Sequence, residues 1–405
     1  MKPTLTLKKS IIMTGLALMA QAQALTLDDY TNPDAPCVER VPGVDFTLVA
    51  DAHTHYRPFG GAAYPYMDVV NMIKNEGVLF SSAIGIGQRL PAGSTNPNTG
   101  APCESYRDCP GVPASPSTEN DHANMAGYAL NQPNITDFVI SNHMTFPDLA
   151  NPSTIAGTMQ TYFDQYGNDA FAFMGEANVV KQALFPNGHV PVTLAQIDNW
   201  GSFMSILESR QIPLMLHSDL GCSPEDATAA LPCAADPIND PDNAKVNTKY
   251  LPLIQKAAST YPNNKIVWLH LGMSSQQKHL DPNLHVQVLR EALDAYPNLS
   301  LDISWGDVLT TYFFDENGLP RPAYVDFLNQ YSDRIITGSD YVAYPNKTND
   351  TYSYKTEVTA SSKINQHLNN TAFRNIALGQ SFLNLAKLSN QYKAPQVCQT
   401  AVPSN

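Results

Sequence analysis

The chain has 405 residues, of which 24 are basic and 37 are acidic, so its formal net charge at pH 7 is −13. A surface this acidic argues against nucleic acid and anionic membrane as partners, and a small-molecule substrate is the partner we expect. The length suits one barrel-sized domain with a large core and leaves the oligomeric state open.

Residues 1–24 have the pattern of a signal peptide. A lysine-rich start precedes a short apolar stretch at 11–20, and Ala22-Gln23-Ala24 forms a small-residue cleavage site. The apolar stretch is short for a bilayer span, and no other segment reaches the length of a transmembrane helix. We therefore predict cleavage after Ala24 or Ala22 and a periplasmic or secreted location.

Behind this signal we expect an N-terminal arm at 25–43, one barrel domain at 44–392 and a C-terminal tail at 393–405. In an oxidising compartment the six cysteines favour disulfides over free buried thiols, and none forms a Cys-x-x-Cys motif. Proximity in the sequence favours two short-range pairs and leaves a third pair that joins the ends of the chain: Cys103–Cys109, Cys222–Cys233 and Cys37–Cys398.

From residue 44 onward, apolar strand-like segments alternate with segments of helical spacing. Helices are predicted at 66–74, 193–208, 250–258 and 286–295, and one or two closing helices within 361–392. Eight strands are predicted, at 46–51, 79–86, 137–141, 170–175, 212–217, 265–270, 299–304 and 334–339. Apolar strands alternating with helices form a parallel sheet covered on both faces, and eight such units form a closed (β/α)8 barrel, the TIM-barrel fold.

Two connections are too long for a simple helix. Residues 87–136 are rich in Pro, Gly, Ser and Asn, and residues 218–248 contain Cys222 and Cys233. Both follow a strand, so both emerge at the C-terminal face of the barrel, where barrel active sites lie. We expect these disulfide-braced loops to shape the substrate pocket.

Side chains suited to metal binding lie at the ends of five predicted strands. They are His53 and His55 on the first strand, Glu176 on the fourth, His217 on the fifth, His270 on the sixth and Asp340 on the eighth. The C-terminal ends of parallel strands meet at one face, and side chains two apart on a strand point to the same side. Imidazole and carboxylate together suit a divalent metal, so the aligned set predicts a metal site.

The segments that carry these residues resemble the amidohydrolase superfamily. The likeness spans about residues 45–388, and it is closest to the amidohydrolase-related branch, which contains hydrolases and non-oxidative decarboxylases. The stretch Phe373-Arg-Asn-Ile-Ala-Leu-Gly-Gln-Ser-Phe resembles the closing helix of that branch. The motifs that carry the resemblance are Asp51-Ala-His-Thr-His, Leu216-His-Ser-Asp, Leu269-His-Leu-Gly and Thr337-Gly-Ser-Asp340.

By this resemblance, a divalent ion, expected to be zinc, is held by His53, His55, His217 and Asp340. Asp340 would also accept a proton from the attacking water. His270 would polarise the substrate carbonyl, shuttle a proton or bind a second ion. Glu176 would bridge two ions, as in relatives with two metals, or contact a ligand or the substrate. One ion is the expectation, with two as the alternative.

Four further residues are predicted to bind the substrate. Arg57 and Arg89 follow the first two strands and could grip a substrate carboxylate with paired hydrogen bonds, although either could equally be a solvated arginine. His143, near the end of the third strand, is expected in the pocket. Trp305, just past the seventh strand, would form an apolar wall.

The expected function is that of an exported, metal-dependent hydrolase that attacks an amide, ester or lactone carbonyl with metal-activated water. A decarboxylase, which is a lyase, on the same metal site is the first alternative. A non-catalytic metal- or ligand-binding protein is the second. Export favours hydrolysis, because exported scavenging enzymes commonly cleave bonds.

Overall fold

The computed structural model describes residues 25–41, 44–221, 248–274, 280–345 and 353–399. Within these residues one parallel sheet forms the centre of the molecule, with its strands in the order β10-β9-β8-β7-β6-β5-β2-β1-β11. The strands are β1 (Ala50–His55), β2 (Phe80–Ile84), β5 (Val139–Met144), β6 (Phe173–Val180), β7 (Leu214–Ser218), β8 (Ile266–Trp268), β9 (Leu299–Ile303), β10 (Ile335–Thr337) and β11 (Tyr341–Val342).

The sheet closes on itself, because β10 and β11 are two parts of one barrel strand. Only Gly338, Ser339 and Asp340 separate them. β10 pairs with β9 on one side, and β11 pairs with β1 on the other, both in parallel. The strands at the two ends of the sheet order are therefore joined, and the predicted (β/α)8 barrel is confirmed.

Close packing between β1 and the segment 338–340 holds this closure together. A Cβ atom on Gly338 would lie 2.6 Å from both the Cβ and the backbone nitrogen of His53, so only glycine allows the approach. Asp51 accepts hydrogen bonds from the backbone N–H of Ser339 at 2.9 Å and from its hydroxyl at 2.7 Å. The backbone N–H of Asp340 donates to the carbonyl of His53 at 2.7 Å.

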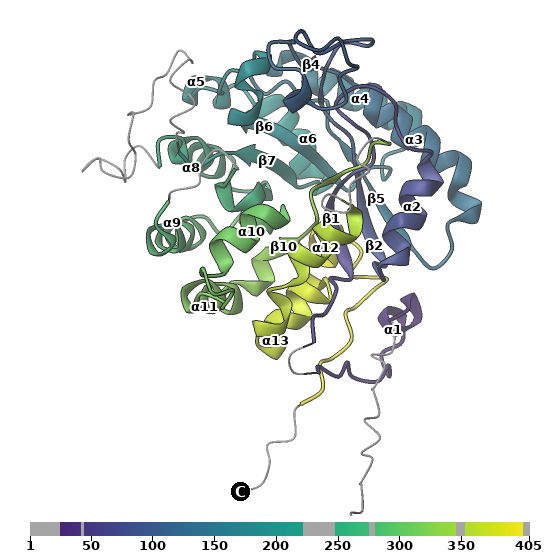
Figure 1. Ribbon diagram of the computed structural model, residues 1–405, viewed down its shortest axis with the longest axis vertical. Helices are drawn as coiled ribbons and strands as arrows, with labels where there is room; N and C mark the ends of the chain where they lie inside the picture. Colours follow the sequence, from purple (N-terminus) through teal and green to yellow (C-terminus); the bar gives the residue numbers. More distant parts are fainter. Residues whose placement is uncertain (1–24, 42–43, 222–247, 275–279, 346–352, 400–405) are drawn as a thin grey trace, which may run out of the picture.

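Helices surround the sheet on its outer side (Figure 1). Apolar side chains from the helices and strands form one large buried core. The helices are α1 (Leu27–Thr31), α2 (Tyr66–Asn75), α3 (Glu119–Asn131), α4 (Ile155–Tyr166), α5 (Leu194–Ile197), α6 (Gly201–Arg210), α8 (Leu251–Thr260), α9 (Pro282–Ala295), α10 (Gly306–Phe313), α11 (Pro322–Gln330), α12 (Tyr354–Ser362), α13 (Asn370–Ala372) and α14 (Gln380–Leu385), with 3-10 turns between several of them.

The predicted helices are present with two differences. The segment 193–208 forms two helices, α5 and α6, instead of one. The long connection 87–136 contains α3 and a small antiparallel ribbon of β3 (Gln88–Arg89) and β4 (Ser115–Pro116). Of the second long connection, residues 222–247 lie outside the described residues, and so do Cys222 and Cys233.

The first strand begins later than predicted. Residues 46–51 were expected to form it, but β1 runs from Ala50 to His55. The reason is that the chain just before Ala50 bonds to the C-terminal part of the protein. The backbone N–H of Leu48 donates to the hydroxyl of Ser362, and that of Val49 donates to the carbonyl of Ala377. His53 and His55, the two predicted metal ligands of this segment, therefore lie within the strand.

A disulfide and a β-bridge bring the two ends of the described chain together. Cys37 is bonded to Cys398, and Val38 pairs with Val397. Cys103 is bonded to Cys109, so both predicted pairs that fall within the described residues are confirmed. The predicted signal peptide, residues 1–24, lies outside them. In the part of the chain that the structure describes, no helix has the length and apolarity that crossing a membrane requires.

Candidate metal centre

The two histidines of β1 are oriented by hydrogen bonds to their Nδ1 atoms. Nδ1 of His53 lies 2.8 Å from Oδ2 of Asp302 in β9, and Nδ1 of His55 lies 2.8 Å from the carbonyl of Gly85. Both acceptors require a proton on Nδ1, which leaves a lone pair on Nε2 of each ring. Nε2 of His53 has no hydrogen-bond partner among the described residues. Each ring is thus prepared to donate its Nε2 lone pair to a cation.

Asp340 completes this side of the site. Its Oδ1 lies 3.2 Å from Nε2 of His55 and 3.5 Å from Nε2 of His53. Its backbone has a left-handed φ of 55°, which is uncommon for a residue other than glycine. This conformation interrupts the last barrel strand between β10 and β11. Asp340 therefore projects from the interruption toward both imidazoles.

Glu176 in β6 lies between two groups of histidines. Its Oε2 is 3.3 Å from Nε2 of His55, and its Oε1 contacts Nδ1 of His217 and lies 3.8 Å from Nε2 of His270. On the far side of the His217 ring, Nε2 is 3.1 Å from Oδ1 of Asp219. If Nε2 donates to Asp219, the lone pair on Nδ1 faces the Glu176 carboxylate. That contact needs a cation, either a proton or a metal ion.

Ser304 contacts a histidine of each group through the Nδ1 atom. Its hydroxyl lies 2.8 Å from Nδ1 of His270 and 3.2 Å from Nδ1 of His53, and it donates to Oδ2 of Asp302 at 2.5 Å. His270 has a left-handed backbone, with φ of 54°. Its Nε2 has no hydrogen-bond partner among the described residues. Non-glycine residues in this conformation are costly and are retained mainly at functional sites.

The electrostatics of the cluster favour positive charge within it. Burial raises the pKa of Glu176, but Lys181 and His217 outweigh burial and hold that pKa well below its usual range. Burial lowers the pKa of His55, but Asp340 and Glu176 outweigh it and raise the pKa to about 9. The carboxylates are thus ionised and attract a cation at the imidazole nitrogens. A divalent ion at this position would replace those protons.

In the part of the chain that the structure describes, three groups of buried side chains have the geometry of metal-ligand sets. Their ligand atoms lie within 4.8 Å of one another, and two of the sets share Glu176. The arrangement fits a divalent ion in two respects. Imidazole Nε2 atoms face carboxylate oxygens, which together are suitable ligands, and hydrogen bonds to the Nδ1 atoms hold the rings in place. The sets are His53, His55 and Glu176, then Glu176, His217 and His270, and finally His53, His270 and Asp302.

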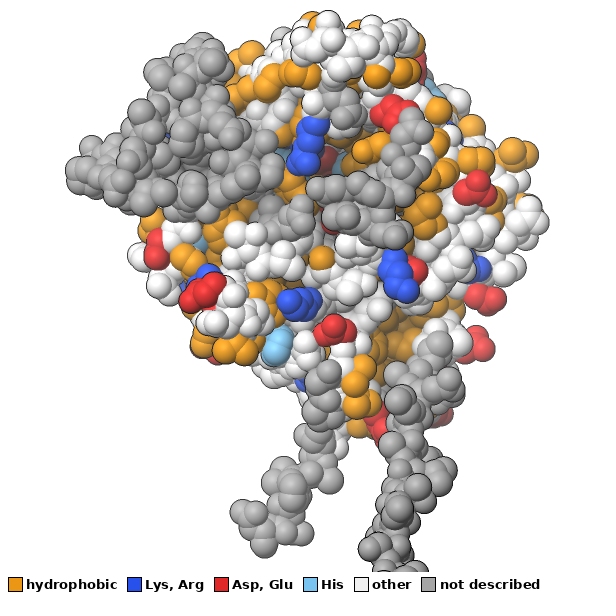
Figure 2. Space-filling view, viewed as in Figure 1, with side chains coloured by type: hydrophobic (Ala, Val, Ile, Leu, Met, Phe, Trp, Pro, Cys, Tyr) orange, Lys and Arg blue, Asp and Glu red, His pale blue; other side chains and the backbone are white. Residues whose placement is uncertain are grey.

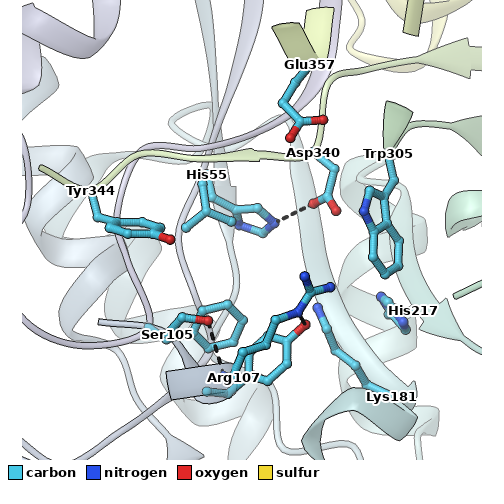
Figure 3. A pocket seen from close by; sticks show the side chains of 12 residues that line it. His55, Ser105, Arg107, Lys181, His217, Trp305, Asp340, Tyr344 and Glu357 are labelled. Atoms are coloured by element: carbon cyan, nitrogen blue, oxygen red, sulfur yellow. Dashed lines mark hydrogen bonds and ion pairs between the residues drawn. The ribbon is translucent and has the colours of Figure 1, made fainter. Parts of the chain in front are cut away.

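A cavity of about 270 Å³ opens onto this cluster. The upper part of the face shown in Figure 2 is hollowed there. The side chains of Lys181, Arg107 and Glu357 reach into the cavity together with the metal-site residues (Figure 3). Among the described residues, the lining is His55, Phe59, Ser105, Tyr106, Arg107, Lys181, His217, Trp305, Asp340, Val342, Tyr344 and Glu357.

The structure brings together the six predicted metal-site residues but only one of the four predicted substrate-binding residues. Trp305 lines the cavity. Arg57 instead donates to Asn124 and to the carbonyl of Ala123, and Arg89 pairs with Glu119. His143 is buried beside the cluster with its Nδ1 on the carbonyl of Gly175, and burial lowers its pKa to about 3.

Several side chains of the site were not predicted. Asp302 and Ser304 hold the histidines from β9 and just beyond it, and Lys181 pairs with Glu176 at 2.7 Å. Asp219 could have been found, because it stands two residues after His217 at the end of a strand. Arg107 carries no sequence signal, because it lies far from every predicted strand end.

Residues 180–364 match the amidohydrolase family model. No curated protein matches the chain.

The chain is similar to many solved structures, among them the following three. A dihydroorotase from Campylobacter jejuni has 12% identity and a TM-score of 0.48, with 86% of each chain covered. A zinc-bound amidohydrolase from Burkholderia multivorans has 11% identity and a TM-score of 0.44, covering 84% of this chain and 99% of that one. A manganese-bound dihydroxybenzoic acid decarboxylase from Polaromonas sp. JS666 has 13% identity and a TM-score of 0.40, covering 84% of this chain and 97% of that one.

The match to the family model includes the segments of His217, His270 and Asp340, which are three of the strand ends that suggested the family. The region from residue 180 to residue 364 therefore has the sequence pattern of the amidohydrolase family, as its strand-end motifs predict.

Proposed function

We propose that the protein is a metal-dependent hydrolase with two divalent ions, expected to be zinc, that cleaves an amide, ester or lactone bond of a small molecule. The position of Glu176 carries this proposal. One of its oxygens faces His55, and the other faces His217 and His270. A carboxylate with one oxygen directed at each of two histidine sets is suited to bridge two ions.

In this proposal the residues divide into two sets. His53, His55 and Asp340 would hold one ion, His217 and His270 would hold the other, and Glu176 would join them. Asp302, Ser304 and Asp219 would fix the orientation of the rings through the nitrogens that do not face the ions. Such ions polarise a carbonyl and lower the pKa of water to about 7.

The protein's own part in the reaction would be to bind the substrate and move a proton. Asp340 is ionised, because His55, His270 and His53 outweigh its burial and lower its pKa. It lines the cavity and can accept a proton from the attacking water. Phe59, Trp305 and Tyr344 would exclude solvent from the substrate and pack on its apolar part.

One observation favours the alternative, a decarboxylase that needs a single ion. The ammonium group of Lys181 is 2.7 Å from Oε1 of Glu176, on the side where the second ion would bind. A positive charge already present there could replace that ion. The number of bound ions separates the two cases. About two zinc ions per chain support the hydrolase proposal, and one ion with Lys181 in place supports the alternative.

The reaction itself can be tested on purified protein loaded with zinc. It would be incubated with lactones, N-acyl amino acids and aromatic acids, and released acid and CO₂ would be measured separately. We expect acid release from one class of ester, lactone or amide, and none after the ions are removed by a chelator. CO₂ without acid release would favour the decarboxylase, and the absence of both would favour a binding protein.

A further inference from the structure

Three consecutive residues of the cavity wall lie inside one small disulfide ring. Ser105, Tyr106 and Arg107 all line the cavity, and the bonded Cys103 and Cys109 enclose them in the sequence. Both cysteines are buried, in a small apolar cluster that also contains Phe59, Leu90 and Leu184. The bond thus anchors a short loop segment in the protein at both ends. The residues between them include a 3-10 turn at Tyr106–Asp108, and the bond holds this segment at the cavity from outside the barrel helices and strands.

Arg107 is the basic residue that this ring directs into the cavity. Its guanidinium carbon lies 5.9 Å from the centre of the Trp305 ring and 5.8 Å from that of the Tyr106 ring. Its Nε donates to the hydroxyl of Tyr106 at 3.3 Å. Trp305 in turn packs edge-on against His270, with the ring centres 5.5 Å apart. One aromatic ring therefore separates the guanidinium from a residue of the metal cluster.

Two basic side chains of the described residues line the cavity, and they differ in what they can bind. The ammonium group of Lys181 is paired with Glu176, next to the histidines. The guanidinium of Arg107 extends into the open part of the cavity, on the side opposite Glu357 (Figure 3). A guanidinium presents paired donors that match the two oxygens of a carboxylate, whereas an ammonium group is a point charge.

We propose that Arg107 binds a carboxylate of the substrate and so makes the enzyme selective for small acids with an apolar or aromatic part. The inference rests on the proposed function, since it places the bond to be cleaved at the metal cluster. The aromatic side chains Phe59, Tyr106 and Trp305 supply the apolar wall between the two ends of such a substrate. The Cys103–Cys109 ring is the positioning element, because it holds Tyr106 and Arg107 at the cavity.

The test measures binding as well as turnover. Zinc-loaded protein is titrated calorimetrically with matched acid and amide pairs, beginning with N-benzoylglycine and N-benzoylglycinamide, then the N-benzoyl derivatives of alanine and β-alanine. We expect at least one acid to bind more tightly than its amide. In Arg107→Gln the affinity for that acid should fall about ten- to hundred-fold, and the affinity for the amide should stay nearly constant. Arg107→Lys should recover part of the loss.

Arg290→Gln is the matched control, because Arg290 lies on α9 and contacts Gln330, Phe327 and Tyr331, none of which lines the cavity. Tyr106→Phe, which removes the hydrogen bond to Arg107, should weaken acid binding a few-fold. The double variant with Cys103→Ser and Cys109→Ser should weaken it too, while zinc content stays unchanged. Zinc analysis and circular dichroism verify that each variant is folded.

The outcomes separate this inference from the proposed function. If no acid of the panel binds better than its amide, or if Arg107→Gln keeps the preference for the acid, Arg107 is not the carboxylate-binding residue. Acid preference that depends on Arg107, without turnover of any substrate, would support the inference and count against the hydrolase. Turnover of neutral and acidic substrates with equal KM would support the hydrolase and count against the role of Arg107.

Discussion

Oδ2 of Asp302 accepts a hydrogen bond from Nδ1 of His53 at 2.8 Å, and the two residues are 249 positions apart in the sequence. The bond joins β9 to β1 across the inside of the barrel. It sets the tautomer of His53 and leaves the Nε2 lone pair directed at the position where an ion would bind. In the proposed centre, where Nε2 of His53 would bind the ion, Asp302 would act through the orientation of the His53 ring.

Replacing Asp302 should weaken metal binding without unfolding the protein. In Asp302→Asn an amide oxygen can still accept from His53, but the negative charge that makes the ring a better ligand is lost. We expect zinc affinity to fall about 10- to 100-fold. A titration with metal buffers would measure it, and Asp333→Asn at an exposed position would be the control. Equal zinc affinity in both variants would mean that the 2.8 Å bond does not orient a ligand.

Glu176→Gln should reduce the number of bound ions from about two to about one. An amide offers one neutral oxygen in place of two charged ones, so it cannot bridge two ions well, and Lys181 would lose its charged partner. Elemental analysis after dialysis would give the ion count per chain. Two ions retained in the variant would contradict a bridging role for Glu176.

Asp340→Asn should abolish most of the turnover while the fold and most of the metal remain. The side chain is next to Nε2 of both β1 histidines, and an amide oxygen can partly replace it as a ligand. It cannot accept a proton from water, so kcat should fall roughly 10²- to 10⁴-fold.

His53→Ala is the comparison for Asp340→Asn, and it should lose metal and activity together. If Asp340→Asn kept a near-normal kcat and a normal metal content, Asp340 would not be the proton acceptor. His270 and Glu176 would then be the next candidates.

Asp121 in α3 should make stability depend on pH. Burial raises its pKa to about 7, against hydrogen bonds from Thr145, Tyr162 and Phe146. The folded protein therefore binds this proton more tightly than the unfolded chain does, whose pKa is about 3.9. The stability that Asp121 contributes is present below about pH 4 and is lost as the pH rises to about 7.

The variant Asp121→Asn has no carboxyl group at this position, so comparison with it isolates the contribution of Asp121 to the pH dependence of stability. The free energy of unfolding of the wild type, minus that of the variant, should fall between about pH 4 and pH 7 and stay level above. Denaturant unfolding at several pH values would measure the difference. A difference independent of pH would show that Asp121 stays ionised throughout.

Removing the bond between the chain ends should lower stability and leave the site intact. Cys37 and Cys398 are separated by 361 positions, so their bond restricts the unfolded chain strongly. We expect the double variant with Cys37→Ser and Cys398→Ser to lose about 2–5 kcal/mol of stability. Its Tm should fall, while its zinc content and its kcat stay normal. A loss of zinc would connect this bond to the metal centre.

The barrel and the gathering of the candidate metal ligands at one face could be predicted, because both follow from local patterns. Each strand is a short apolar run, and the position of a histidine or carboxylate at its end is visible within that run. The parallel arrangement then places all such ends at one face. The placement of His53, His217 and Asp340 at this face could be predicted without knowing how the helices pack.

The helix α3 could not be predicted in the same way, because its buried face is polar. Asn120, Asp121 and Asn124 are buried there, and they bond to loop backbone and to Arg57. Hydrophobic periodicity is the signal for an amphipathic helix, and it is missing from this segment. The same contact explains why Arg57 does not reach the cavity.

The position of Arg107 in the cavity could not be predicted from the sequence either. The two predicted carboxylate-binding arginines were chosen because they follow strands, yet the arginine in the cavity comes from the middle of a long loop. Its position depends on which cysteines pair and on how the enclosed residues pack on Trp305. Those contacts involve residues about two hundred positions apart, and no local pattern encodes them.

The bond between Cys37 and Cys398 also makes this stretch of the chain a covalent ring. The Cα atoms of the two cysteines are 4.9 Å apart, so a peptide linker of a few residues could take the place of the bond. New termini could then be opened at an exposed turn such as that of Gly93, so that the barrel strands follow one another along the chain from a different starting point. A circularly permuted protein made in this way would keep every candidate ligand of the proposed metal centre and would fold without that disulfide.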